Sequence, residues 1–142
     1  MLQVYLKPTN FCNVGCDFCY LPEEVRADKG RMSPSTLESA MHLVRDLASR
    51  EGHDGVSIIY HGGEPLTLPV EALIAFSDSV REALAGLRVV ESIQTSLIPL
   101  RPSHITFLHD RCDGHVGSSI DFGGRTISGS SEKYISLWMD KV

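Results

Sequence analysis

Three cysteines that lie within eight residues are the side chains whose type and spacing most directly suggest chemistry. Cys12, Cys16 and Cys19 have the spacing CxxxCxxC. Thiolates are soft ligands that suit zinc, copper(I) and iron–sulfur clusters. A cubane cluster normally takes one cysteine for each iron, so three cysteines leave one iron open to a substrate. The alternative is a structural zinc, with Cys112 or a histidine as its fourth ligand.

The composition predicts a single soluble domain. The 142 residues are 42% hydrophobic and 22% charged, as in ordinary globular proteins. A net charge of −5 gives no basic excess for binding nucleic acid. The sequence has no apolar stretch long enough to cross a bilayer, and MLQVYLKPTN lacks the features of a signal peptide. We therefore expect a cytoplasmic protein with neither a nucleic-acid nor a membrane partner.

The first half of the sequence predicts two strands that flank a helix. Residues 2–6 alternate apolar and polar side chains, which predicts a strand that leads into a cysteine-bearing loop. The charged stretch from Glu23 to Arg31 is expected to be a solvated connection. Ser33 is a helix cap, and the helix behind it ends before Gly52. The β-branched run 56–60 predicts a buried strand.

The second half continues the alternation of strand and helix. A helix that includes residues 73–84 precedes a third strand over 87–95. Ser103 is expected to cap a short helix, and residues 115–120 form a plausible fourth strand. This alternation predicts a parallel sheet with right-handed crossovers. Residues 122–131 are rich in Gly and Ser and predict a loop, and 132–140 are too few to assign.

A second motif, Tyr60-His61-Gly62-Gly63-Glu64-Pro65, follows the second strand. Two glycines permit a close approach that side chains would forbid. A cationic amine at this edge would find carbonyl groups, with the Glu64 carboxylate nearby. The simpler alternative is a strand-to-helix turn with a solvated glutamate, because Gly and Pro mark turns in any protein. His61 has the sequence context of an ordinary exposed or hydrogen-bonded histidine.

The stretch Lys7-Pro8-Thr9-Asn10-Phe11-Cys12-Asn13-Val14-Gly15-Cys16-Asp17-Phe18-Cys19-Tyr20 resembles the cluster loop of radical S-adenosylmethionine (SAM) enzymes. That family has an aromatic residue before the last cysteine, as Phe18 is here. Asn13 and Tyr20 resemble the SPASM-type branch that matures peptides and proteins, which includes the anaerobic sulfatase-maturating enzymes. The resemblance implies a [4Fe-4S] cluster on the three cysteines, with SAM chelating the fourth iron through its amino and carboxylate groups.

Further residues acquire roles only through this resemblance. The GGEP-like segment implies that Gly62, Gly63 and Glu64 bind the SAM amino group. Gln94-Thr95-Ser96 and Ser118-Ser119-Ile120-Asp121 resemble segments that line the SAM and substrate pocket, although Ser96 and Phe122 replace the usual Asn and Gly. The segment from Arg125 to Glu132 resembles another family segment but follows the fourth strand too closely, so we treat it as coincidence. The cofactor-binding candidates are Phe18, Gly62, Gly63, Glu64, Thr95, Ser119 and Asp121.

All four matching segments follow predicted parallel strands, at the edge where α/β proteins gather their ligands. The expected fold class is α/β, the N-terminal four strand–helix units of a partial (β/α)6 TIM-like barrel that is apparently truncated. A partial core domain would span residues 1–121, with a loop and an atypical tail over 122–142. A sheet that stops at the fourth strand would leave an edge open and suit turnover poorly.

The implied function is an oxidoreductase that cleaves SAM reductively and generates a 5′-deoxyadenosyl radical, with a peptide or protein side chain as substrate. Its electron donor would be a flavodoxin- or ferredoxin-like protein. The alternatives are a non-catalytic zinc- or cluster-binding module and a cluster-bearing electron carrier without a SAM site. No residue stands out as a catalytic acid or base.

Overall fold

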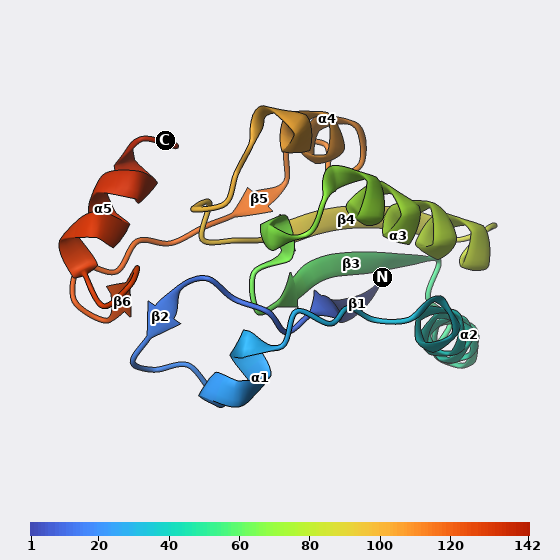
Figure 1. Cartoon of the computed structure of the whole chain (residues 1–142). Helices are drawn as coiled ribbons and strands as arrows, with labels where there is room; N and C mark the ends of the chain where they lie inside the picture. The colour runs from blue at the N-terminus through green and yellow to red at the C-terminus, as the bar shows by residue number, and fades with distance from the viewer.

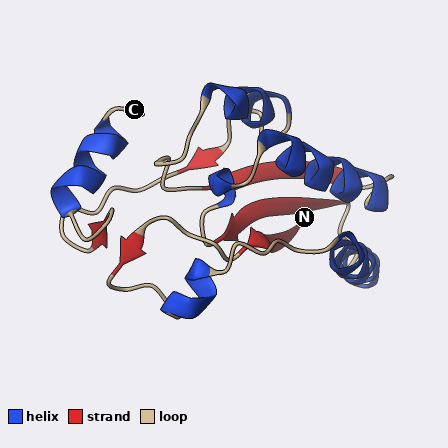
Figure 2. Cartoon of the chain, in the orientation of Figure 1, coloured by secondary structure: helices blue, strands red, loops and turns tan.

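A computed structural model describes all residues, 1–142, as a parallel sheet covered by helices (Figures 1 and 2). The elements in chain order are β1 (Leu2–Thr9), β2 (Gly15–Cys16), α1 (Glu23–Ala27), α2 (Pro34–Arg50), β3 (Gly55–Gly62), the 3-10 helix η1 (Pro65–Thr67), α3 (Val70–Ala83), β4 (Arg88–Gln94), α4 (Pro102–Asp110), β5 (Val116–Gly117), β6 (Arg125–Thr126) and α5 (Ser131–Met139).

The main sheet has four parallel strands in the order β1-β3-β4-β5, which confirms the predicted fold class. Leu2 pairs with Val56, and the register slips near the end of β1, beyond Leu6. The fourth strand is much shorter than the predicted 115–120, because only Val116 and Gly117 pair with β4. The carboxyl ends of all four strands meet at one edge, next to the cysteine loop.

Alternate side chains of β3 face opposite sides of the sheet, as strand geometry requires. The even-numbered residues 56–60 are buried, while the odd-numbered residues 57–61 are partly exposed. The buried side chains belong to one core cluster that also includes the inner faces of α2, α3 and α4. Helices therefore cover one face of the sheet, while on the other face the side chain of Tyr5 in β1 is 61% exposed.

A buried carboxylate lies inside the helix-covered layer. Glu91 of β4 accepts hydrogen bonds from the Tyr60 hydroxyl at 2.6 Å, from Ser77 at 3.0 Å and from the Arg81 Nε at 2.5 Å. Burial and the adjacent Glu91 charge hold the pKa of Tyr60 well above its usual range. The three donors satisfy a group that would otherwise be costly to bury.

Two helix starts differ from the sequence predictions. The charged stretch expected to be a solvated connection contains α1, where Glu23 and Glu24 occupy the first turn and Arg26 the last, a charge order that favours a helix. The second difference concerns α4, which begins at Pro102, so that Ser103 lies inside the helix and is not its cap. Proline is pre-organised for the first helical position, and here it overrides the serine signal.

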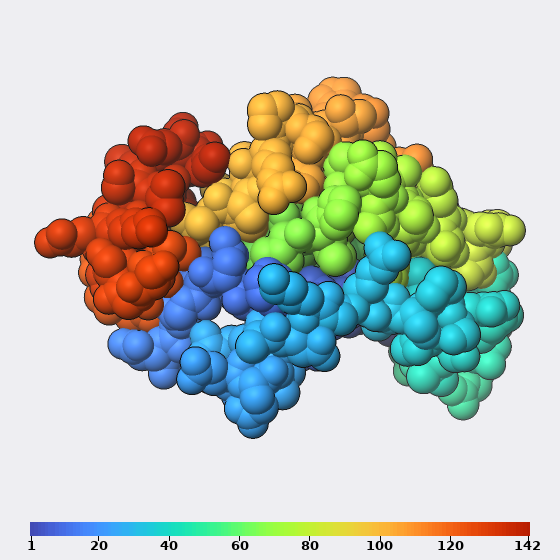
Figure 3. Space-filling view, viewed as in Figure 1, coloured from blue at the N-terminus to red at the C-terminus, as the bar shows by residue number.

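The segment after Asp121 is more ordered than the predicted loop. β6 pairs antiparallel with β2, so that Cys16 lies opposite Arg125. Helix α5 follows and packs on β6, with Tyr134 fully buried. Figures 2 and 3 show this C-terminal segment against the loop that follows β1. The pairing could not be read from the sequence because β2 and β6 have two residues each.

None of the helices combines the length and the apolar character needed to span a membrane.

Candidate functional site

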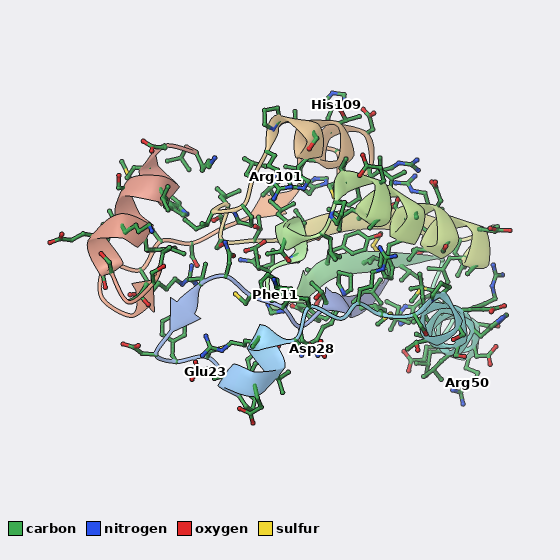
Figure 4. The ribbon with its side chains drawn as sticks, in the orientation of Figure 1. Phe11, Glu23, Asp28, Arg50, Arg101 and His109 are labelled. Atoms are coloured by element: carbon green, nitrogen blue, oxygen red, sulfur yellow. The ribbon has the colours of Figure 1, made fainter.

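The cysteine loop leaves β1 and is held by its backbone on two sides. On one side, the Cys12 amide donates to the Arg26 carbonyl of α1 at 3.0 Å. On the other, the Asp17 amide donates to the Gly124 carbonyl at 2.9 Å, next to the β2–β6 pair. Figure 4 shows Phe11 at the start of this loop, close to the helix that carries Glu23. Two distant parts of the chain therefore fix the position of the loop.

The GGEP segment contacts this loop so closely that its first two positions must be glycine. The Gly63 amide donates to the Thr9 carbonyl at 3.1 Å, and the Glu64 amide donates to the Phe11 carbonyl at 2.8 Å. A Cβ atom at Gly63 would overlap the carbonyl oxygens of Asn10 and Phe11. Gly62 has a φ of +125°, which side chains other than glycine rarely adopt. The predicted close approach is therefore an approach of backbone to backbone.

The Glu64 carboxylate is buried and holds the end of β4. Its Oε1 accepts from the Leu66 amide at 3.1 Å and from the Thr95 hydroxyl at 2.6 Å. Its Oε2 accepts from the amide and the hydroxyl of Ser96, at 2.7 and 2.5 Å. The residue is only 2% exposed, so the solvated glutamate considered from sequence is wrong. Glu64 joins the turn after β3 to the turn after β4.

A cavity of about 130 Å³ opens at the carboxyl edge of the sheet. It brings together segments that are far apart in the sequence: the cysteine loop, the GGEP segment, the end of β4 and the segment after β5. Its lining is largely polar. The lining residues are Cys12, Val14, Cys16, His61, Gly63, Glu64, Gln94, Thr95, Ser96, Ser119 and Arg125.

All four cysteines are free thiols. Cys12 and Cys16 line the cavity, whereas Cys19 is not part of its lining. No group of three or more His, Cys, Asp or Glu side chains is arranged to hold a metal ion.

The two cavity thiols are protonated near neutral pH. Burial raises the pKa of the Cys12 thiol to about 11. Burial also raises the pKa of Cys16, although the positive charges of Arg125 and Arg26 oppose that effect. Metal binding requires the thiolate form, so it must release protons here. The same two arginines favour that release at Cys16.

The Arg125 guanidinium joins the cysteine loop to the C-terminal segment. It donates to the Ser119 carbonyl at 2.5 Å and hydroxyl at 3.0 Å, and to the Tyr134 hydroxyl at 3.1 Å. It also lies over the Phe18 ring, 5.7 Å from the centroid. Ser119 therefore lines the cavity while it positions Arg125.

Asp121 has a local structural role. Its Oδ1 accepts hydrogen bonds from the amides of Gly123 and Gly124, at 3.0 and 2.6 Å. These amide hydrogen bonds hold the pKa of Asp121 below its ordinary value. The turn that results leads into β6. Asp121 does not line the cavity, unlike Ser119 of the same sequence motif.

The structure places Cys112 and His61, two further candidates from the sequence, in different environments. Cys112 is fully buried in the core beneath the sheet, where burial and the Glu91 charge raise its pKa to about 12. It lines no part of the cavity, so the structure does not favour it as a fourth zinc ligand. His61 does line the cavity, where burial and the charge of Lys7 lower its pKa from 6.5.

The sequence reasoning missed Arg26 and Arg125. Arg26 lay in a stretch expected to be solvated, and Arg125 lay in a segment dismissed as coincidence. Arg26 is placed by α1, and its Nη1 donates to the Val14 carbonyl at 3.3 Å. The acid-then-base order of Glu23, Glu24 and Arg26 was the available signal for that helix.

Comparison with known sequences identifies the family. The sequence model of the Radical SAM superfamily matches residues 6–126, which run from β1 through β6. The chain belongs to the radical SAM superfamily. Its four-stranded parallel sheet and the loop after β1 thus lie in the part that this superfamily shares.

Two curated relatives cover a smaller part of this radical SAM chain. An uncharacterised protein of Archaeoglobus fulgidus is 35% identical over 75 residues, which is 52% of this chain and 16% of the relative. The uncharacterised protein sll1766 of Synechocystis is 35% identical over 68 residues, or 48% of this chain and 16% of the relative. The match thus spans about a sixth of each relative's length.

Solved structures of anSMEcpe, an anaerobic sulfatase-maturating enzyme, have a similar fold. Native anSMEcpe with bound AdoMet superposes with a TM-score of 0.70 at 22% identity, covering 99% of this chain and 41% of that one. The same enzyme with bound AdoMet and the Kp18Cys peptide gives a TM-score of 0.69. At this identity the likeness extends to the fold, and the chain spans less than half of the neighbour.

The residues around the cavity fit a thiolate-ligated iron–sulfur cluster. Three cysteines form the donor set, and two of them line the cavity. The only buried side-chain polar atoms of the chain without a hydrogen-bond partner are the Nε atoms of Arg26 and Arg125, which suit an anionic group beside the loop. The hydroxyl-bearing residues Thr95, Ser96 and Ser119 also line this cavity.

Proposed function

We propose that this chain is the cofactor-binding part of a radical SAM enzyme, with a [4Fe-4S] cluster on Cys12, Cys16 and Cys19 and SAM in the adjoining cavity. One observation carries the proposal: the cavity unites two of these cysteines with the GGEP segment, the end of β4 and the segment after β5. When bound and reduced, such a cluster supplies the electron that cleaves SAM to methionine and a 5′-deoxyadenosyl radical, which abstracts hydrogen from the substrate.

The protein's own residues would bind and orient the SAM molecule. The Glu64 carboxylate already accepts four hydrogen bonds, so we assign the SAM amino group chiefly to the backbone carbonyls of Gly62 and Gly63. Thr95 and Ser119 lie on the cavity wall and would contact SAM there, while their hydroxyl groups hold the side chains of Glu64 and Arg125. Phe18 would help to position the loop because the Arg125 guanidinium lies over its ring. Asp121 would shape the adjoining turn by accepting a hydrogen bond from the Gly124 amide.

The proposed substrate is a peptide or protein side chain, and the proposed electron donor is a flavodoxin- or ferredoxin-like protein. The Cys19-Tyr20 and Tyr60-His61-Gly62-Gly63-Glu64-Pro65 details support the peptide-maturing branch. The similar fold of anSMEcpe, whose structure contains a peptide, supports the same choice. Tyr5, Lys7 and His61 project from the face of the sheet that no helix covers, where a substrate would approach the cavity.

Anaerobic reconstitution with iron and sulfide tests this proposal. The full chain should take up a cubane cluster whose EPR spectrum, after reduction, changes when SAM is added. Cys16→Ala should abolish the cluster. Cys112→Ala is the matched control, because this cysteine lies in the core away from the cavity, and it should leave the iron content unchanged.

Other results would favour a different function. A colourless protein that holds one zinc ion would support a structural module, and a cluster whose spectrum ignores SAM would support an electron carrier. Release of 5′-deoxyadenosine on reduction, measured by chromatography, would extend the result from binding to cleavage.

A further inference from the structure

Two arginines on opposite sides of the cysteine loop share an unusual property. Among the buried side-chain nitrogen and oxygen atoms of the chain, only the Nε atoms of Arg26 and Arg125 have no hydrogen-bond partner. Buried donors are nearly always paired, because a donor removed from water without a partner loses its hydrogen bond. Both residues lie far apart in the sequence and meet only at this loop.

Arg26 approaches the loop from α1. Its backbone carbonyl accepts from the Cys12 amide at 3.0 Å, and its Nη1 donates to the Val14 carbonyl at 3.3 Å. Together with Cys12 it lines a second cavity, between the loop and the helix. Arg26 therefore contacts the loop through both its backbone and its side chain.

Arg125 approaches from the opposite side. It pairs with Cys16 across the β2–β6 ladder and lines the first cavity with Cys12 and Cys16. Ser119 and Tyr134 fix its terminal nitrogens, so the side chain has little freedom to turn away. Both positive charges act on the Cys16 thiol.

The acidic groups nearby are partly neutralised by donors of their own. Glu64 accepts four hydrogen bonds and Asp121 accepts two. Glu23 lines the second cavity with Arg26 and opposes its charge. Asp17 lies in the loop itself, where its side chain is exposed to solvent. The two guanidinium groups are therefore the partly buried charges beside the loop that lack a complete set of partners.

We propose that Arg26 and Arg125 are positioning residues that bracket the cysteine loop and stabilise the anionic cluster that it holds. This inference rests on the proposed function. A cubane on three thiolates is anionic and becomes more so on reduction, so nearby positive charge favours the reduced form. Charge and hydrogen bonds around the sulfurs are recognised determinants of cluster potential. Removal of either charge should make the cluster harder to reduce.

The test is an EPR-monitored redox titration of the reconstituted full chain without SAM. Arg26→Gln and Arg125→Gln each remove the charge and keep a polar side chain. At a fixed potential we expect the ratio of reduced to oxidised cluster to fall roughly tenfold, a shift of about 59 mV for a one-electron couple. Arg26→Lys and Arg125→Lys should retain most of the wild-type potential.

Arg45→Gln is the matched control. Arg45 also donates to backbone carbonyls, those of Ala83 and Ala85, but it lies at the α2–α3 contact away from the loop. Its replacement should leave the potential unchanged. EPR reads only the loaded fraction, so reduced loading of a variant does not obscure the result.

Several outcomes would overturn the inference. It is wrong if both glutamine variants titrate at the wild-type potential, or if the lysine variants shift as far as the glutamine variants. It is wrong for Arg125 if Arg125→Gln weakens SAM binding while the potential stays unchanged. Failure of the wild-type chain to assemble a cluster would instead refute the proposed function, and that result is known before any variant is compared.

Discussion

Glu64 and Ser96 are joined by two hydrogen bonds to a single carboxylate oxygen, one from the Ser96 amide at 2.7 Å and one from its hydroxyl at 2.5 Å. The pair links the turn after β3 to the turn after β4. Both residues line the cavity, so the distance between the two turns sets part of its shape.

Ser96→Ala should weaken this link. It removes one of the two hydrogen bonds to a buried carboxylate, and we expect the free energy of unfolding to fall by about 1.5–3 kcal/mol. Urea denaturation measures the change. Ser79→Ala is the control, because the Ser79 hydroxyl donates to the Ala75 carbonyl on an exposed helix surface, and it should be nearly neutral. Equal stability of both variants would contradict the role given to Ser96.

Gly63→Ala should displace the cysteine loop. The added methyl group would overlap the carbonyl oxygens of Asn10 and Phe11, which are backbone atoms that cannot turn aside. We expect a loss of roughly 2 kcal/mol or more in unfolding free energy and a lower iron content after reconstitution.

Gly123→Ala provides the comparison for this variant, because nothing lies within 4 Å of the added atom. It should fold and load iron like the wild type. A Gly63→Ala protein with unchanged iron content and stability would show that the contact between the GGEP segment and the loop is looser than described.

The buried hydroxyl of Tyr60 predicts a pH dependence of stability. The pKa of Tyr60 is raised above its ordinary value of 10.0, chiefly by burial, so unfolding lets the phenol ionise. The contribution of the un-ionised Tyr60 phenol to the free energy of unfolding is fully present below pH 10. It is lost as the pH rises from there through the raised pKa. Tyr60→Phe should lower stability by about 2 kcal/mol at neutral pH, because it removes a hydrogen bond to Glu91.

Urea denaturation across pH 8–11 measures this effect. Above pH 10, the stability of the wild type should fall more steeply than that of Tyr60→Phe. Tyr5→Phe changes an exposed ring and should follow the wild type at every pH. Parallel curves for wild type and Tyr60→Phe would exclude Tyr60 as the source of the dependence.

Asp121 predicts a loss of local stability at acid pH, in contrast to the loss at alkaline pH that Tyr60 predicts. Its carboxylate holds the amides of Gly123 and Gly124, and those hydrogen bonds lower the pKa of Asp121 below 3.8. The contribution of the Asp121 carboxylate to the stability of this turn is therefore fully present above its ordinary pKa. It is lost as the pH falls through the lowered pKa. Hydrogen exchange of the two amides, observed by NMR, should accelerate relative to the neighbouring β6 amides as this occurs.

Asp121→Asn is the informative variant here. Its side-chain oxygen can still accept from both amides, but it does not titrate, so the extra acceleration at acid pH should disappear. If the variant and the wild type show the same pH dependence, another group controls the turn.

The strands and long helices could be predicted because each has a local pattern. Ser33 caps α2 by accepting from the Thr36 amide at 3.1 Å, as a serine before a helical pattern predicts. The run 56–60 lies within β3. The site edge was also predictable, since the cysteine loop, Gly63, Thr95 and Ser119 all line one cavity.

What the sequence could not reveal depends on contacts between distant residues. The two glycines were expected to permit a close approach, and the sequence could not show that the backbone of residues 9–11 approaches them. Glu64 was expected either to bind a cofactor or to be a solvated turn residue, and its burial by donors from Leu66 in its own turn and from Thr95 and Ser96 after β4 could not be foreseen. The pairing of Cys16 with Arg125 involves strands of two residues, which have no detectable period. Such contacts are set by tertiary packing, which local pattern does not encode.

The pairing of Cys16 with Arg125 also orders events during synthesis. Domains acquire their contacts as the chain leaves the ribosome, N-terminal parts first. The cysteines emerge early, yet one side of their loop is held only after β6 has been translated. Nascent chains should therefore carry these thiols on a loop that is held from the α1 side alone until β6 has been translated.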